Sequence, residues 1–166
     1  MTTPGVSSAI VQRVLPAAPD EVYDAWLDPA SLLEWMCPRP ARCLKVEADT
    51  RIGGHLRIDI EEAGVQFYVH GVFTDLDRPV RLGFTWSCST WPDPTLSTHV
   101  LVTLASHGES QTLMTITHTA LSPDLVDRHH HGWELIADQL AVSLRPPKGG
   151  EDLSRRMSSW RPDSAT

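Results

Sequence analysis

The chain has 166 residues, of which 41% are hydrophobic and 21% are charged, values typical of one globular domain. Its formal net charge of -7 at pH 7 argues against nucleic acid as a partner, because nucleic-acid-binding surfaces are basic. No run approaches the roughly 20 apolar residues of a membrane span, and the first ten residues do not resemble a secretion signal, so we expect a cytoplasmic protein.

The first part of the chain predicts a strand followed by two short helices. Residues 8–16 form a β-prone run that ends in a proline. Acidic residues typical of a first helical turn come next, and apolar residues then recur at helical spacing as far as Trp35. Because proline disfavours the α conformation in the residue before it, Asp28-Pro29 is expected to divide this stretch into two helices.

Residues 44–118 predict a series of antiparallel strands. Apolar and polar residues alternate here, as at Leu56, Ile58 and Ile60, which indicates a sheet with one buried face. Turn residues, including the expected hairpin turn at 61–64, separate the runs. The other side chains expected on the buried face are Phe67, Val69, Gly71, Phe73, Leu82, Phe84, Trp86, Val100, Val102, Leu104, Met114, Ile116 and His118.

From Ser122 onward the apolar residues follow a helical period. Ser122 is a suitable N-cap, and Pro123 suits a first helical turn. The apolar stripe continues to Leu144 and ends before Pro146-Pro147. We therefore expect an α+β domain over residues 1–145, in which a long C-terminal helix covers the apolar face of the sheet, and a flexible or loosely docked tail over residues 146–166.

The expected interface between sheet and helix mixes large and small side chains. Rings such as Phe84, Trp86 and Trp133 stand beside Gly71 and Gly132. A curved sheet cannot contact a straight helix along its whole length, so this mixture predicts an internal apolar cavity suited to a small ligand.

His118 shares its strand parity with Met114 and Ile116 and is therefore expected to face the interior. Two interpretations remain open: the imidazole bonds a ligand or water in the cavity, or a neighbouring side chain satisfies it within the core. If the domain is an enzyme, His118 is the only candidate for a general base.

Several segments, taken in order, resemble the START-like (SRPBCC) superfamily, and specifically the branch named after activators of the ATPase of the 90-kDa heat-shock chaperone. The resemblance covers about residues 8–144. The segments that carry it are 17–26 (AAPDEVYDAW), 33–35 (LEW), 51–56 (RIGGHL), Gly71, 77–86 (DRPVRLGFTW), 115–118 (TITH) and 132–135 (GWEL).

The resemblance implies a helix-grip fold with an internal hydrophobic cavity. Family members bind lipids, polyketides or other apolar compounds, some cyclise polyketides, and a few bind a reactive natural product to protect their host. The activators themselves carry a second domain that grips the chaperone, for which this chain is too short. Combined with the strand and helix periodicity, the resemblance predicts that the ligand-binding residues are Trp35, Phe67, Phe73, Phe84, Trp86, His118, Trp133, Ile136 and Leu140.

The sequence shows few signs of catalytic, nucleotide-binding or metal-binding motifs. It contains no nucleophile elbow, phosphate-binding loop or dinucleotide fingerprint. His129, His130 and His131 are adjacent, and consecutive helical side chains point about 100° apart, so they are not expected to bind one metal ion. We expect no metal and no cofactor. His55, His70 and His99 are expected on the outer face of the sheet, while Trp91 and Trp160 are expected to be exposed.

The three cysteines are expected to be free thiols. They are Cys37, Cys43 and Cys88, and a reducing compartment would keep them unpaired. A loop disulfide between Cys37 and Cys43 is the less favoured alternative.

The sequence thus favours a protein that binds a small hydrophobic or aromatic molecule and is not an enzyme. An enzyme acting on such a molecule, of the cyclase or hydrolase type, and a chaperone-binding interaction module are the alternatives.

Overall fold

The computed structural model describes residues 7–93 and 95–145, so the predicted tail at 146–166, including Trp160, lies outside the described residues. The elements in chain order are β1 (Ser7–Leu15), α1 (Pro19–Leu27), α2 (Pro29–Trp35), β2 (Arg42–Ala48), β3 (His55–Glu62), β4 (Val65–Asp77), β5 (Arg81–Cys88), β6 (Thr98–Ser106), β7 (Thr112–Leu121) and α3 (Pro123–Leu144).

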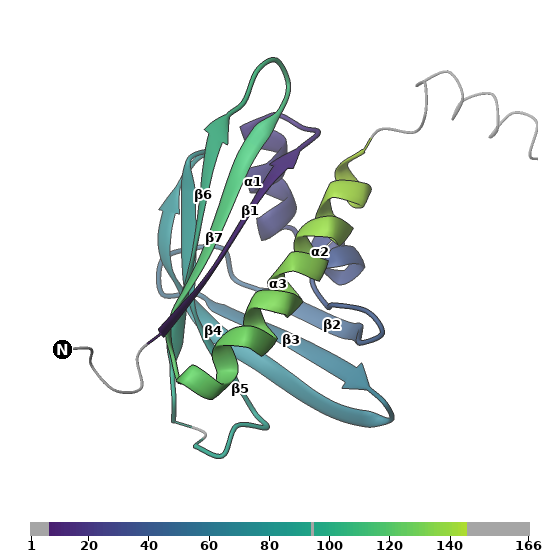
Figure 1. The fold of residues 1–166 in the computed structure, drawn as a ribbon, viewed down its shortest axis with the longest axis vertical. Helices are drawn as coiled ribbons and strands as arrows, with labels where there is room; N and C mark the ends of the chain where they lie inside the picture. Colours follow the sequence, from purple (N-terminus) through teal and green to yellow (C-terminus); the bar gives the residue numbers. More distant parts are fainter. Residues whose placement is uncertain (1–6, 94, 146–166) are drawn as a thin grey trace, which may run out of the picture.

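The seven strands form one antiparallel sheet in the order β1-β7-β6-β5-β4-β3-β2. The chain therefore meanders from β2 to β7, and β1 joins at the far side by pairing with β7. The sheet curves around α3, which crosses it diagonally from the β5 end toward α2 (Figure 1). The prediction of a helix-grip fold is confirmed, with two short helices and a long C-terminal helix.

Local sequence explains where the helices begin. Each has a proline in its first turn, where the missing backbone N–H costs no hydrogen bond. Asp28 ends α1 and caps α2, since its carboxylate accepts a hydrogen bond of 3.1 Å from the Ala30 backbone N–H. The division of the helical stretch at Asp28-Pro29 is thus confirmed.

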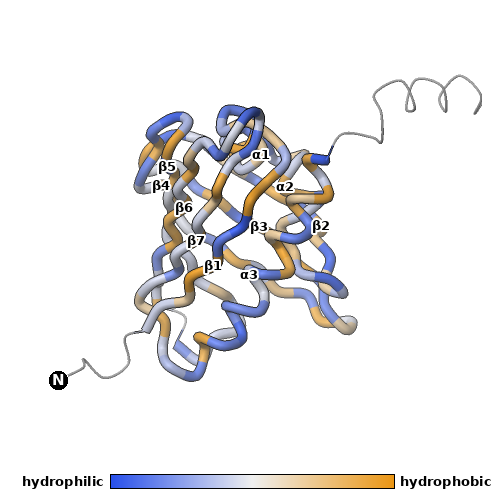
Figure 2. Tube along the Cα trace, turned by 45° about the horizontal axis from the view of Figure 1, so that its top comes forward, coloured by the Kyte–Doolittle hydropathy of each residue, from blue (hydrophilic) through white to orange (hydrophobic). Residues whose placement is uncertain are grey.

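The core lies between the sheet and the three helices. Burial alternates along the strands, as in β3, where Leu56, Ile58 and Ile60 are buried between more exposed neighbours. Hydropathy accordingly changes from residue to residue along the strands (Figure 2). On the outer face His55 and His70 are exposed and His99 is half-buried, as expected.

Gly71 does not widen the interior, contrary to the expectation that its small size leaves room there. A Cβ built on Gly71 would lie 1.7 Å from the backbone oxygen of Thr85 on the neighbouring strand. The glycine therefore permits close approach of β4 and β5, where the Val72 N–H also donates to Thr85 Oγ1 at 2.9 Å.

The loop between α2 and β2 is fixed in two ways. Cys37 and Cys43 form a disulfide, so the preference for three free thiols is wrong, and Cys88 is a buried free thiol. In addition, the Gln139 side chain on α3 donates to the carbonyl oxygens of Trp35 and Cys37 at 2.9 and 2.8 Å. The disulfide closes the loop on itself, and the Gln139 hydrogen bonds hold it against α3.

Candidate functional site

Six large rings meet between the sheet and the helices, and we call them the aromatic cluster: Trp26, Trp35, Phe73, Phe84, Trp86 and Trp133. Trp26 of α1 contacts three of the other rings, with its ring centroid 4.9 Å from that of Trp35 and 6.2 Å from those of Phe84 and Trp133. Trp86 contacts Trp133 at 5.4 Å and Phe84 at 6.0 Å. The cluster thus connects all three helices to the middle of the sheet.

Most of the predicted ligand-binding residues lie in or beside this cluster. Trp35, Phe73, Phe84, Trp86 and Trp133 belong to it, and all are buried. Ile136 and Leu140 are buried on the same helix as Trp133. Phe67 is half-buried and takes no part in the ring contacts found among the described residues.

His118 is completely buried, and both of its ring nitrogens are hydrogen-bonded. The Trp133 indole N–H donates to Nδ1 at 3.0 Å, which makes Nδ1 the acceptor and places the proton of the neutral ring on Nε2. Nε2 lies 2.7 Å from Thr98 Oγ1, and the Thr98 hydroxyl in turn donates to the Trp86 carbonyl at 2.7 Å. Each donor in this series of hydrogen bonds has one acceptor, which fixes the tautomer of His118.

This arrangement does not support His118 as a general base. Burial lowers the pKa of His118 to about 3, with smaller contributions from His129 and His99. A ring with this pKa and with both nitrogens bonded has no free lone pair for a substrate proton. Of the two interpretations left open by the sequence, the core histidine satisfied by neighbouring side chains describes the structure.

The indole N–H of Trp26 has no hydrogen-bond acceptor among the described residues, even though Trp26 is almost completely buried, with 2% of its surface exposed. The neighbouring Trp35, in contrast, donates its N–H to Ser31 Oγ at 2.9 Å. Trp26 lies in the stretch whose helical periodicity the sequence shows, but periodicity cannot show whether its N–H has a partner.

Two further residues at the site were not among the predicted ligand-binding residues. Trp91, in the loop between β5 and β6, is buried rather than exposed, and its ring lies 5.9 Å from that of His129. The ring centroids of His129 and His118 are 5.0 Å apart. His129 Nδ1 lies 3.0 Å from the Leu125 carbonyl oxygen, and burial lowers the pKa of His129. The β5–β6 loop therefore covers the interior at the first turns of α3.

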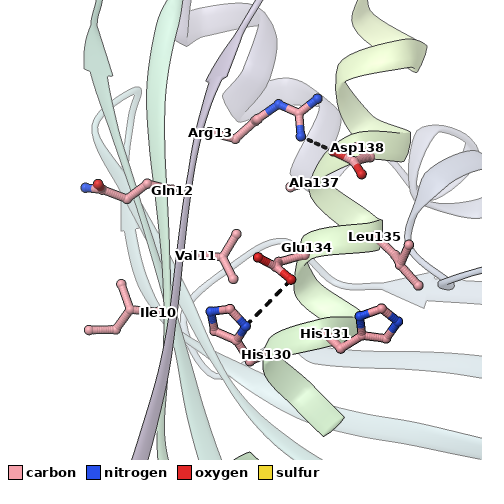
Figure 3. A pocket seen from close by; sticks show the side chains of 10 residues that line it. All are labelled: Ile10, Val11, Gln12, Arg13, His130, His131, Glu134, Leu135, Ala137 and Asp138. Atoms are coloured by element: carbon pink, nitrogen blue, oxygen red, sulfur yellow. Dashed lines mark hydrogen bonds and ion pairs between the residues drawn. The ribbon is translucent and has the colours of Figure 1, made fainter. Parts of the chain in front are cut away.

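Two pockets of the described chain lie at its surface. The first, of about 410 Å³, is a groove between β1 and α3 (Figure 3). An ion pair between Arg13 and Asp138 crosses it, and His130 contacts Glu134 at 3.7 Å, whereas His131 points away from β1 (Figure 3). The adjacent histidines diverge, as expected.

The second pocket lies over the disulfide loop and measures about 520 Å³. Its walls include Leu33, Pro40 and the two bonded cysteines. Neither surface pocket is the predicted internal cavity, which is not confirmed: the rings that should line it contact one another.

The family model described as "Activator of Hsp90 ATPase homolog 1-like protein" (AHSA1) matches residues 16–145. The chain belongs to this family. The matched range runs from the end of β1 to the end of α3, so the AHSA1 match includes the whole aromatic cluster. The described part of this AHSA1 protein contains no helix that is long and apolar enough to cross a membrane.

Several solved structures are similar to this chain. Protein CV1439 from Chromobacterium violaceum is 26% identical, with a TM-score of 0.76 over 84% of this chain and 98% of that one. The AHSA1 (SPO3351) protein from Silicibacter pomeroyi is also 26% identical. Its TM-score is 0.72, and the match covers 83% of this chain and 97% of that one. CalU16 from Micromonospora echinospora, at 23% identity, has a TM-score of 0.64 over 93% and 86%, and shares the fold. None of the curated proteins is significantly similar to this chain.

Proposed function

We propose that this AHSA1 protein binds a small hydrophobic or aromatic molecule between the sheet and α3, at the aromatic cluster. The observation that carries the proposal is the composition of this interface, where six rings from α1, α2, α3 and two strands meet. A ligand with apolar rings would replace ring–ring contacts by contacts of the same kind and similar energy. Its entry then requires a shift of the rings but little loss of interaction energy.

Two features favour such a shift at the N-terminal half of α3. Gly132 lies in the interior of the helix beside Trp133, where glycine weakens a helix by roughly 0.5–1 kcal/mol relative to alanine. The β5–β6 loop covers the same region through the contact of its Trp91 with His129 of α3. We infer that a ligand enters between this loop and α3.

The proposal can be tested by titrating the ¹⁵N-labelled protein with a panel of probes: tetralin, 1-tetralone and myristate. We expect the indole N–H signals of the cluster tryptophans to move on binding. Phe84→Leu should weaken binding roughly 2- to 10-fold, because an aromatic contact contributes about 0.5–1.5 kcal/mol. Val142→Ala, a change on the exposed side of the same helix as Trp133, should leave binding unchanged.

The result against the proposal would be binding that perturbs only the groove between β1 and α3, or no binding by any of the probes. In the first case the ligand occupies the surface pocket beside Arg13 and Asp138 rather than the cluster.

The expected cytoplasmic location also remains part of this proposal, and the disulfide offers a way to examine it. A reducing compartment would keep Cys37 and Cys43 as thiols. Alkylation of the protein in freshly lysed cells, followed by mass spectrometry, should label both cysteines if the protein resides there. Recovery of the unlabelled disulfide would argue against that location.

A further inference from the structure

Three of the four indole groups of the aromatic cluster differ in the hydrogen bonding of their N–H. Trp133 donates its N–H to His118, and Trp35 donates to Ser31 Oγ. Trp26 lies between these two rings and is as deeply buried, but its N–H has no acceptor among the described residues. Within the described chain, Trp26 Nε1 is thus the buried side-chain polar atom that remains unpaired.

An unpaired donor in an apolar core is unfavourable. A buried N–H without a partner destabilises a folded protein by roughly 1–3 kcal/mol, and most buried polar groups are bonded for this reason. The buried polar side chains Thr98, Thr112 and His118 follow that rule, since each is hydrogen-bonded. Trp26 is the exception, and a ligand with an acceptor would remove the penalty.

We propose that the ligand carries a neutral oxygen acceptor, of the ketone, quinone or ether class, which accepts a hydrogen bond from Trp26 Nε1–H and makes Trp26 a specificity-determining residue. This inference rests on the proposed function, because it concerns the ligand of the same site. The Trp26 N–H would select, among apolar molecules, those that carry an acceptor oxygen at this position.

The acceptor is neutral because of the surroundings of Trp26. The buried side chains of the described chain include no lysine or arginine, so a carboxylate at the cluster would be a buried charge without a counterion. A ketone oxygen has no such penalty. Myristate should therefore not place its carboxylate against Trp26.

The pair 1-tetralone and tetralin tests the inference, since the two probes have the same ring skeleton and differ by one carbonyl oxygen. We expect the wild-type protein to bind 1-tetralone about tenfold more tightly than tetralin, as a newly satisfied buried donor predicts. In ¹H–¹⁵N spectra the Trp26 indole signal, assigned with Trp26→Phe, should move downfield with 1-tetralone and not with tetralin.

Two variants make the comparison specific to one N–H. Trp26→Phe removes the unpaired donor and should reduce the preference for 1-tetralone to near unity. Trp35→Phe removes a donor that already has an acceptor, so the ratio of the two affinities should remain about tenfold, whatever happens to each affinity alone.

The outcomes separate the two proposals. If both probes bind equally and the Trp26 signal does not move with 1-tetralone, the inference is overturned while the proposed function stands. If the preference persists in Trp26→Phe, another donor recognises the carbonyl, and the inference is again overturned. If neither probe nor myristate binds, the proposed function fails as well.

Discussion

The two ends of the aromatic cluster are held together by different interactions. At the end near the β5–β6 loop, a hydrogen-bond chain runs from Trp133 through His118 and Thr98 to the Trp86 carbonyl. At the end formed by α1 and α2, Trp26 contacts three rings and its N–H has no acceptor within the described chain, while the Cys37–Cys43 disulfide and Gln139 fix the adjacent loop. Buried side-chain hydrogen bonds specify the first end, whereas ring packing, the disulfide and the hydrogen bonds of Gln139 hold the second.

The sharpest test of this difference compares Trp133→Phe with Trp26→Phe. Both substitutions remove the same ring volume, but Trp133→Phe also leaves His118 Nδ1 without a donor, whereas Trp26→Phe removes an N–H that has no acceptor. We expect Trp133→Phe to lower the free energy of unfolding by about 3 kcal/mol and Trp26→Phe by less than about 1 kcal/mol. Urea denaturation measures both, and equal losses would contradict the distinction.

The second prediction concerns pH and depends on the His118 end alone. The folded-state pKa of about 3 lies below the ordinary value of 6.5, so the neutral ring stabilises the fold above pH 6.5. This stabilisation should be lost as the pH falls from 6.5 toward 3, by about 1.4 kcal/mol per pH unit. The lowered pKa of His129 acts in the same direction.

Urea midpoints at pH 7, 6 and 5 measure this slope. His118→Gln, whose amide can donate and accept but does not titrate, should make the slope shallower. His55→Gln, a change at an exposed site on the outer face of the sheet, serves as the matched control. A slope that is the same in all three proteins would show that His118 is not the group that titrates.

The third prediction concerns the Trp26 end. The disulfide joins cysteines six residues apart. Closing so short a loop lowers the entropy of the unfolded chain and raises its free energy by about 2 kcal/mol. A reducing agent should therefore lower the free energy of unfolding of the wild type by that amount. Cys43→Ser should start at the lower value and show no response to the reductant.

The smallest expected effect comes from Gly132→Ala, in the helix that joins the two ends. A Cβ here would lie 3.9 Å from Pro38 Cγ, an ordinary contact, so alanine should raise stability by roughly 0.5–1 kcal/mol. The stiffer helix should also slow the association of 1-tetralone, which stopped-flow fluorescence can follow. Unchanged kinetics would mean that α3 does not bend there during entry.

Much of this site follows from strand and helix periodicity. The alternation along β5 and β7 identifies Phe84, Trp86 and His118 as interior residues, and the stripe on α3 does the same for Trp133. The loop residue Trp91 belongs to no periodic element, so its burial could not be predicted in this way. The same holds for the loop disulfide, for which the expected reducing compartment favoured the opposite state.

The sequence by itself determined the order of the elements, the face that each strand and helix buries, and the family. Only the tertiary structure decided which side chains meet across that face: that His118 is satisfied by Trp133 and Thr98, that Gly71 is covered by the β5 backbone, and that Trp26 lacks an acceptor. Periodicity fixes the direction in which a side chain points. The partner it meets comes from another element, and its position depends on how the sheet curves and where the helices rest.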